Sequence, residues 1–477
     1  MKYTKARQTR AAALPLRQAT AGPYMTKLIT ALGLSLCLWI GVGLKAASQG
    51  IIRDAEIEQI LRDYTDPILE AAGLVPGDVK LFIINDQSLN AFVAGGQRIH
   101  LNTGLIIQAD TPGQLKGVIA HETGHIAGGH GVQRIQDMRV ASRPALVSIG
   151  LGILAMAAGA GEAGAALIAS SQQFAALNFF THTRVQEASA DQMAVDFLTR
   201  SGQSSAGLIE FFENFRYQEV LSETRRYPYF RSHPLASDRI RSLRERAEET
   251  GLLDVPPTDE DVAKLATMHA KLIGFLEPPA RVFQRYPLTD TSEPARYARS
   301  ISAMQSADIT TALREIDALI EISPENPYYY ELKGQILFES GRAAESVPPL
   351  ENAIELLPDQ PLLLIAYARS VIAREEEGDV VIGEEALRDA LIVEPENAFA
   401  WAQLAIALEK QGLRAQAQLA TAESAYYVGD FPRAYSFAMR AAQDLEPGSH
   451  DARRAGDVRN ATDPALPENE IYWRRRR

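Results

Sequence analysis

His121-Glu122-Thr123-Gly124-His125 lies in a segment that reads as a helix, opened by Thr111-Pro112 and closed by Gly128-Gly129. Histidines four residues apart project from one face of a helix, where both imidazoles can bind a single Zn²⁺. The glutamate between them is then placed to take a proton from water beside the metal. The pentapeptide therefore predicts a zinc hydrolase with His121 and His125 as ligands, one zinc ion per chain and Glu122 as the general base.

The motif leaves the third ligand open. A third histidine in the same stretch would have to stand at position 131, which is Gly131 here. His130 is one residue out of register and is expected at the helix end or behind the ligands. Glu187 and Asp191 are better placed, because they lie four apart on a second helix that the capping-box spacing of Thr183 and Gln186 starts. Glu187 can complete a His₂Glu site, and Asp191 can accept the free ring N–H of a ligand histidine.

The developing oxyanion of a peptidase needs a donor besides the metal. Arg239, His182 and His233 are the candidates, and the sequence does not choose among them. Arg239 is equally open to a structural role. His233 precedes Pro234, which holds it extended on a loop. From such a loop His233 would either donate to the transition state or occupy the open zinc position and block water, and a plain surface loop is the remaining alternative.

HETGH, EASAD at 187–191 and SHPLASDRI at 232–240 follow one another in the order found in HExxH gluzincin metalloproteases related to HtpX and the CAAX prenyl protease. Asn90–Gly96 and Asn102–Leu105 also resemble that family. With an export signal and C-terminal helical repeats, the chain most resembles the periplasmic BepA-type proteases, which are linked to outer-membrane protein assembly and quality control. The resemblance implies His121, His125 and Glu187 as zinc ligands, Glu122 as catalytic base, and a His233 loop that lies over the site.

Residues 1–48 read as a signal peptide that directs the chain to the periplasm. Six basic residues precede the apolar run Leu28–Leu44, and Ala46-Ala47-Ser48 offers small residues for cleavage. The long basic leader suggests Met25 as an alternative start, and an uncleaved inner-membrane anchor is the alternative to cleavage. The single cysteine, Cys37, lies inside the apolar run, so a mature chain without it needs no disulfide.

The net charge of −12 argues against a nucleic-acid partner and for an acidic, soluble surface. One further apolar segment, 144–171, approaches membrane composition. We expect it to pack around the site or to contact a membrane peripherally, because a span would put His125 and Glu187 on opposite sides of a bilayer.

Strands are expected at 79–84 and 97–101, and the second is expected near the cleft, where it could align an extended peptide. His100 in that strand reads as structural.

From about residue 255 the composition changes, and Pro324-Glu325-Asn326 recurs as Pro358-Asp359-Gln360 and Pro395-Glu396-Asn397. The first interval is the tetratricopeptide period.

The expected fold is an α+β zincin-like protease domain, mostly helical with a small sheet, followed by an all-α tetratricopeptide-repeat solenoid. Its expected parts are a signal peptide at 1–48, the zinc metalloprotease domain at 49–268, a linker at 269–295, the repeats at 296–447 and a flexible tail at 448–477.

Two classes of function remain open. The first is a zinc metalloendopeptidase of the cell envelope whose repeats recruit misfolded or stalled outer-membrane proteins, or their assembly machinery. The second is a chaperone-like adaptor whose zinc site is structural or autoinhibited. A purely structural zinc site needs no general base, so Glu122 favours the peptidase.

Overall fold

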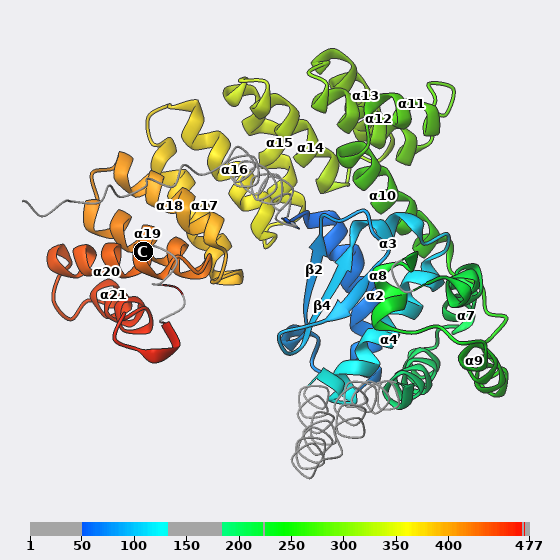
Figure 1. Ribbon diagram of the computed structural model, residues 1–477. Coiled ribbons are helices and arrows are strands. Elements are labelled where there is room, and N and C mark those ends of the chain that lie inside the picture. The colour runs from blue at the N-terminus through cyan, green and yellow to red at the C-terminus, as the bar shows by residue number, and fades with distance from the viewer. Residues whose placement is uncertain (1–49, 132–183, 223–224, 470–471, 473–477) are drawn as a thin grey trace, which may run out of the picture. The chain divides into compact units, whose positions relative to one another are not determined.

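The computed structural model describes residues 50–131, 184–222, 225–469 and 472 (Figure 1). The expected signal peptide, the apolar segment 144–171 and the residues Thr183 and His182 all lie outside these ranges. Across the described ranges, every helix is too short or too polar to cross a bilayer.

A four-stranded sheet lies at the start of the protease domain, in the order β1-β2-β4-β3. Its strands are β1 (Ile51–Ile52), β2 (Lys80–Ile84), β3 (Ala91–Val93) and β4 (Arg98–Asn102). β2 and β4 pair in parallel, and the other two pairs are antiparallel. The two strands expected from the sequence are confirmed as β2 and β4, whereas β3 was not expected.

Successive side chains of β4 point to opposite faces of the sheet, and each face has a different environment. Ile99 and Leu101 are fully buried, while His100 on the other face is stacked between Phe82 and Phe92, with ring centroids 5.1 and 4.7 Å away. His100 is therefore structural, as expected. The prediction that this strand aligns a peptide is wrong, because β2 and β3 already pair with its two edges.

Helices pack around the sheet to form one apolar core. They are α2 (Ala55–Ala71), α3 (Thr103–Gln108), α4 (Pro112–Ala127), the helical residues 184–200, α7 (Ala206–Asn214), α8 (Pro228–Ser232) and α9 (Ser237–Glu249). Two short 3₁₀ turns, Pro76–Asp78 and Arg216–Val220, lie between these elements.

Helix α4, which carries the HExxH motif, begins and ends where its sequence predicts. The Thr111 side chain accepts a hydrogen bond from the backbone N–H of Gln114, and Pro112 opens the first turn. Gly128 caps the other end, followed by Gly129 with φ of 63°. Gly117 and Gly124 let two neighbours approach closely: an added Cβ would meet Leu208 Cβ of α7 at 2.7 Å and the Ala190 carbonyl oxygen at 2.9 Å.

The segment expected to be a linker, 269–295, is largely helical. α10 (Asp259–Leu276) and α11 (Pro279–Arg285) occupy most of it, and α10 packs against α12 (Glu293–Gln305). Buried Lys271 of α10 pairs with Asp54 at 2.8 Å and with Glu56 at 3.2 Å. The Tyr297 hydroxyl of α12 donates to Glu56 at 2.9 Å. These buried polar contacts join the first helix of the protease domain to the helices that follow it.

The remaining helices form antiparallel pairs (Figure 1). They are α12 with α13 (Ile309–Ile322), α14 (Pro327–Glu339) with α15 (Ala343–Leu356), α16 (Pro361–Arg374) with α17 (Asp379–Val393), α18 (Ala398–Lys410) with α19 (Arg414–Tyr427), and α20 (Phe431–Asp444) with α21 (His450–Ala461). Asn326, Gln360 and Asn397 each cap the first helix of a pair by accepting from its backbone N–H groups. The recurring Pro-x-Asn or Pro-x-Gln element is therefore a helix start, and the predicted fold class is confirmed.

The expectation of a flexible tail from 448 is wrong for residues 450–461. They form α21, which packs on α19 and α20 through Ala455 and Val458. Arg454 of α21 is also ion-paired with buried Glu423 of α19, and its guanidinium lies 4.6 Å from the Trp401 ring centroid. Few apolar residues are enough here, because the preceding helices supply the rest of the interface.

Candidate metal centre

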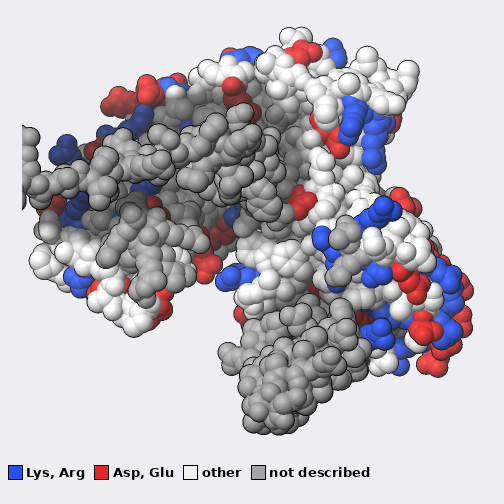
Figure 2. Space-filling view, viewed as in Figure 1, with Lys and Arg blue, Asp and Glu red and all other residues white. Residues whose placement is uncertain are grey.

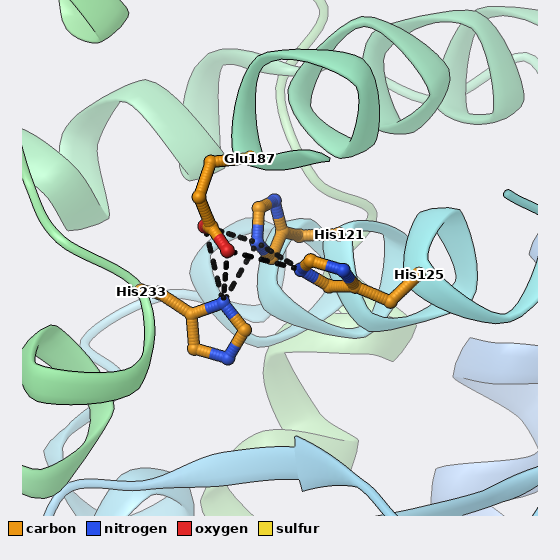
Figure 3. A group of neighbouring side chains, drawn as sticks. All are labelled: His121, His125, Glu187 and His233. Carbon is orange, nitrogen blue, oxygen red and sulfur yellow. Dashed lines mark hydrogen bonds and ion pairs between the residues drawn. The ribbon is translucent and has the colours of Figure 1, made fainter. Parts of the chain in front are cut away.

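The two histidines of α4 point into the same space, as the helical period requires (Figure 3). His121 is fully buried and His125 nearly so, and their Nε2 atoms lie 3.1 Å apart. The Gly128 cap ends the helix just beyond His125.

Glu187 reaches this pair from the helical residues 184–200 (Figure 3). Its Oε2 lies 3.3 Å from His121 Nε2, and its Oε1 lies 3.5 Å from His125 Nε2. The close approach of Gly124 to Ala190 brings the two helices near enough for these contacts. The structure thus brings together the three residues that the sequence suggested as ligands.

Asp191 lies one turn beyond Glu187 and contacts the other nitrogen of His121, with Nδ1 2.9 Å from Oδ1. Arg239 of α9 holds this carboxylate from the other side, donating from Nε and Nη2 at 2.8 Å each. The same guanidinium lies 3.2 Å from Glu187 and donates to the Pro234 carbonyl. Arg239 therefore fixes two carboxylates and the His233 loop, and its donors are engaged rather than aimed at a substrate.

His233 follows α8 and lies among the other three side chains (Figure 3). Its Nδ1 is 3.1 Å from Glu187 Oε2 and 3.3 Å from His121 Nε2, while its Nε2 is 3.4 Å from Glu122 Oε1. Its ring is stacked on Tyr229, with centroids 4.7 Å apart. The alternative of a plain surface loop is wrong, because His233 is only 6% exposed and sits inside the site.

The donor set fits a metal ion. One ligand atom from each of His121, His125, Glu187 and His233 lies within 4.8 Å of the others. With His121 Nδ1 turned toward Asp191, the inward atoms of this group are mainly lone pairs, and acceptors so close together repel unless a cation or extra protons lie between them. Three of these residues, His121, His125 and Glu187, make the His₂Glu ligand set of zinc sites that keep a fourth position open, and His233 lies at that fourth position.

The charges of the site follow from burial and neighbours. Burial lowers the pKa of His121, but contacts with Asp191 and Glu187 outweigh it and raise that pKa to about 9. Burial and the His121 charge lower the pKa of His125. Burial alone would raise the pKa of Glu187, yet His233, His121 and Arg239 hold it well below its usual range. The site therefore favours an ionised Glu187 facing positive charge.

Glu122 is fully buried, with Oε1 3.4 Å from His233 Nε2, and burial raises the pKa of its carboxyl group despite His233 and His121. Among the described residues neither carboxylate oxygen has a hydrogen-bond partner. A buried carboxylate without hydrogen bonds is costly, and such groups concentrate at functional sites.

Tyr229 is a site residue that sequence reasoning missed. It is fully buried, and its hydroxyl has no hydrogen-bond partner in the described part of the chain. Burial and the nearby Glu122 carboxylate raise the pKa of this hydroxyl. In the sequence, the only sign of Tyr229 is its position four residues before His233. The helical turn α8 is what brings the two side chains together. His130 lies behind the site, with Nδ1 3.0 Å from His125 Nδ1, and His182 lies outside the described residues.

Charged side chains of both signs lie on the described surface. Figure 2 shows Lys and Arg interspersed with Asp and Glu on the described residues of the face in view. That mixture is unlike the basic stripe of a nucleic-acid-binding protein.

Comparison with known proteins places this site in a family. Residues 52–247 match the model of peptidase family M48. The chain is 24% identical over 414 residues to the beta-barrel assembly-enhancing protease of Escherichia coli K12, covering 85% of this chain and 84% of that protein. It is 22% identical to the Yersinia pestis protein of the same name, over 86% and 84%. Metalloprotease LoiP of Escherichia coli K12 is 29% identical over 37% of this chain and 65% of its own length.

Among solved structures, the chain is similar to YrrB, described as a TPR protein with an unusual peptide-binding site. That likeness has 14% identity and a TM-score of 0.30, covering 38% of this chain and 91% of the other, and a score so low supports no inference. The family match and the relatives do support one: this chain contains a peptidase family M48 domain and is a metalloprotease.

Proposed function

We propose that this chain is a zinc-dependent endopeptidase of the bacterial cell envelope. In this proposal it is exported to the periplasm by its N-terminal signal and cleaves misfolded or stalled outer-membrane proteins. The observation that carries the peptidase activity is the convergence of His121, His125 and Glu187 beside a buried Glu122 whose carboxylate makes no hydrogen bond to the described residues. The cellular role rests on relatives named for β-barrel assembly that match 85% of this chain.

His121, His125 and Glu187 would hold one zinc ion. When bound, zinc supplies a Lewis acid that polarises the peptide carbonyl and lowers the pKa of water. Glu122, whose carboxylate makes no hydrogen bond to the described residues, takes the proton of the attacking water and passes it to the leaving amine. Asp191 holds His121 in the tautomer that turns Nε2 inward, and Arg239 holds Asp191 and Glu187 in place.

The oxyanion donor has to come from a group that is not otherwise engaged. Arg239 is engaged by two carboxylates and a carbonyl, which leaves the Tyr229 hydroxyl and His233 as donors in the described site. Tyr229 needs no movement to keep its hydroxyl free, whereas His233 Nδ1 contacts the ligands themselves. We assign the donor role to Tyr229.

His233 occupies the position that water and substrate need. Its Nδ1 lies as close to Glu187 and His121 as those two lie to each other, which supports a closed resting site in this proposal. Opening requires the turn after α8 to move, which breaks the stacking on Tyr229 and the contact of Pro234 with Arg239. His233 therefore acts as a plug that a substrate or partner displaces.

β3 is the strand best placed to align a substrate. It pairs with β4 on one side, and no described strand pairs with its other edge. β3 also packs against α4, which carries the catalytic motif. An extended peptide added to this edge would run past Glu122, with its backbone hydrogen bonds replacing side-chain specificity. Stalled β-barrel precursors offer such extended segments.

Cleavage of unfolded casein by the purified, zinc-loaded mature chain tests the activity. We expect wild type to cleave slowly, His233→Ala to cleave faster, and 1,10-phenanthroline to stop both. His269→Ala is the matched control, since His269 is a partly buried histidine whose Nε2 donates to the Ile106 carbonyl at 2.8 Å, away from the site. Absence of cleavage by both wild type and His233→Ala, with zinc bound, would overturn the peptidase proposal.

The alternative function is a chaperone-like adaptor with an autoinhibited zinc site. The single observation in its favour is His233 among the ligands, which leaves the metal no open position. If the chain is an adaptor, the wild-type protein and the Glu122→Gln variant should suppress aggregation of an unfolded protein equally well. The same casein assay separates the two, because an adaptor does not gain cleavage with His233→Ala.

A further inference from the structure

Three side chains form a row across successive repeats. Phe338 lies on α14, Arg369 on α16 and Phe399 on α18, and these are the first helices of three neighbouring pairs. The Arg369 guanidinium carbon lies 4.8 Å from the Phe338 ring centroid and 5.4 Å from that of Phe399. A guanidinium held between two aromatic rings has few rotamers left, and stacking on ring faces leaves the N–H groups at its edge able to donate.

Arg369 differs from the neighbouring arginines in its contacts. Among the described residues it makes no hydrogen bond or ion pair, whereas Arg374 and Arg388 nearby bind Asp379 and Glu384 at 2.6 and 2.7 Å. Burial lowers the pKa of Arg369, and only the charge of Glu339 opposes this. The N–H donors of this half-buried guanidinium are therefore available to a ligand. Charge-assisted hydrogen bonds to a carboxylate are among the strongest that a guanidinium can form.

Apolar surface continues from the cation. The Phe399 ring is 49% exposed, and Ile406, two turns further along α18, is 48% exposed. Residues seven apart share a helical face, so Ile406 lies on the same face of α18 as Phe399, which contacts Arg369. The first helices of these pairs contact one another, α14 with α16 and α16 with α18, and stacked repeats form an extended concave surface suited to binding.

We propose that Arg369, flanked by Phe338 and Phe399, is a receptor for an acidic side chain of an unfolded polypeptide, with an adjacent apolar residue of that polypeptide packing on Phe399 and Ile406. The charge of the receptor and the apolar surface next to it select a short segment in which a Glu or Asp neighbours a large aliphatic residue. This proposal deepens the proposed function by giving the repeats a recognition chemistry for substrates.

The test measures binding without cleavage, in the full chain carrying Glu122→Gln. The probes are two capped 12-residue Gly/Ser peptides with the same neutral fluorophore, one containing Leu-Glu and the other Leu-Gln. We expect the parent to bind the Leu-Glu peptide about tenfold more tightly by anisotropy, as one charge-assisted hydrogen-bond pair warrants. Arg369→Gln should abolish that preference, and Phe399→Ala should weaken both peptides severalfold.

Arg388→Gln is the matched control, because Arg388 lies on α17 with its side chain 51% exposed and bound to Glu384. It should keep the tenfold preference. Arg369→Lys retains the charge without the planar stacking and should keep a reduced preference, which guards against misfolding of the Gln variant. Equal affinities for the two peptides in the parent, or a preference that survives Arg369→Gln, would overturn the receptor. Neither result depends on whether the chain cleaves casein.

Discussion

Replacing Gly124 with alanine tests how the two halves of the site are held together. Gly124 lies in the HExxH motif but is not expected to touch the metal. Its α-carbon faces the backbone of the helical segment that carries Glu187, and an added Cβ would lie 2.9 Å from the Ala190 carbonyl oxygen and 3.0 Å from Ala190 Cα. Both obstacles are backbone atoms, which cannot rotate away. The two helices therefore have to move apart.

The size of that movement follows from the contact distance. Ordinary contacts of a Cβ begin at 3.4 Å, so a 2.9 Å approach requires a separation of about 0.5 Å. Metal–ligand distances tolerate about 0.2 Å. The displaced Glu187 should therefore weaken zinc binding roughly 10- to 100-fold, as loss of a positioning contact does. Overpacking should also cost about 1–3 kcal/mol in the free energy of unfolding of the metal-free chain.

The assay is competition for zinc against a chromophoric chelator, together with urea unfolding of the metal-free chain. Gly456→Ala is the control: Gly456 lies within α21, where an added Cβ meets nothing within 4 Å. This variant should bind zinc as wild type does and gain up to about 1 kcal/mol of stability from helix propensity. If Gly124→Ala binds zinc as tightly as wild type, the contact between the two helices does not position Glu187, and the reasoning fails.

Three further predictions follow from individual contacts. Asp191→Asn should weaken zinc affinity roughly 10- to 100-fold by releasing His121, and unchanged affinity in the chelator competition would contradict it. Tyr229→Phe should lower kcat for casein about 10- to 100-fold while zinc affinity stays the same, and a change in KM alone would remove Tyr229 from catalysis. Burial beside Asp54 and Glu56 raises the pKa of Glu331 to about 7 despite Lys271, so its folded form binds the extra proton between pH 4.5 and 7. As the pH rises from 4.5 to 7, the free energy of unfolding should therefore fall by up to about 3 kcal/mol more in wild type than in Glu331→Gln. Parallel pH profiles of the two proteins would refute this.

Much of the site follows from the sequence because its rules are local. The HExxH spacing, the Thr111 cap and the Gly128-Gly129 stop are all properties of one helix, and the structure has that helix where they predict it. Glu187 followed from counting, since two histidines are one ligand short and the Glu187–Asp191 pair has the spacing of one helical face. The structure then places both carboxylates against His121.

The features that the sequence did not predict depend on distant neighbours. β3 is only three residues long, and it is a strand because β4 lies beside it. α21 is polar enough to suggest disorder, but Glu423 and Trp401 provide a partner and a ring for Arg454. Nothing in the sequence singles out Tyr229 or Arg369. Each stands out only in the fold, because among the described residues its polar group makes no hydrogen bond. Missing partners appear only once the structure is known.

The central claim is that His121, His125 and Glu187 bind a zinc ion, whereas Glu122 is the general base for the attacking water and is not a zinc ligand. Zinc content and casein cleavage, measured together on wild type, Glu122→Gln and Glu187→Gln in the His233→Ala background, test it most directly. We expect one zinc per chain with cleavage in the parent, one zinc per chain without cleavage in Glu122→Gln, and neither in Glu187→Gln. Cleavage by Glu122→Gln, or a full zinc content in Glu187→Gln, would contradict the account.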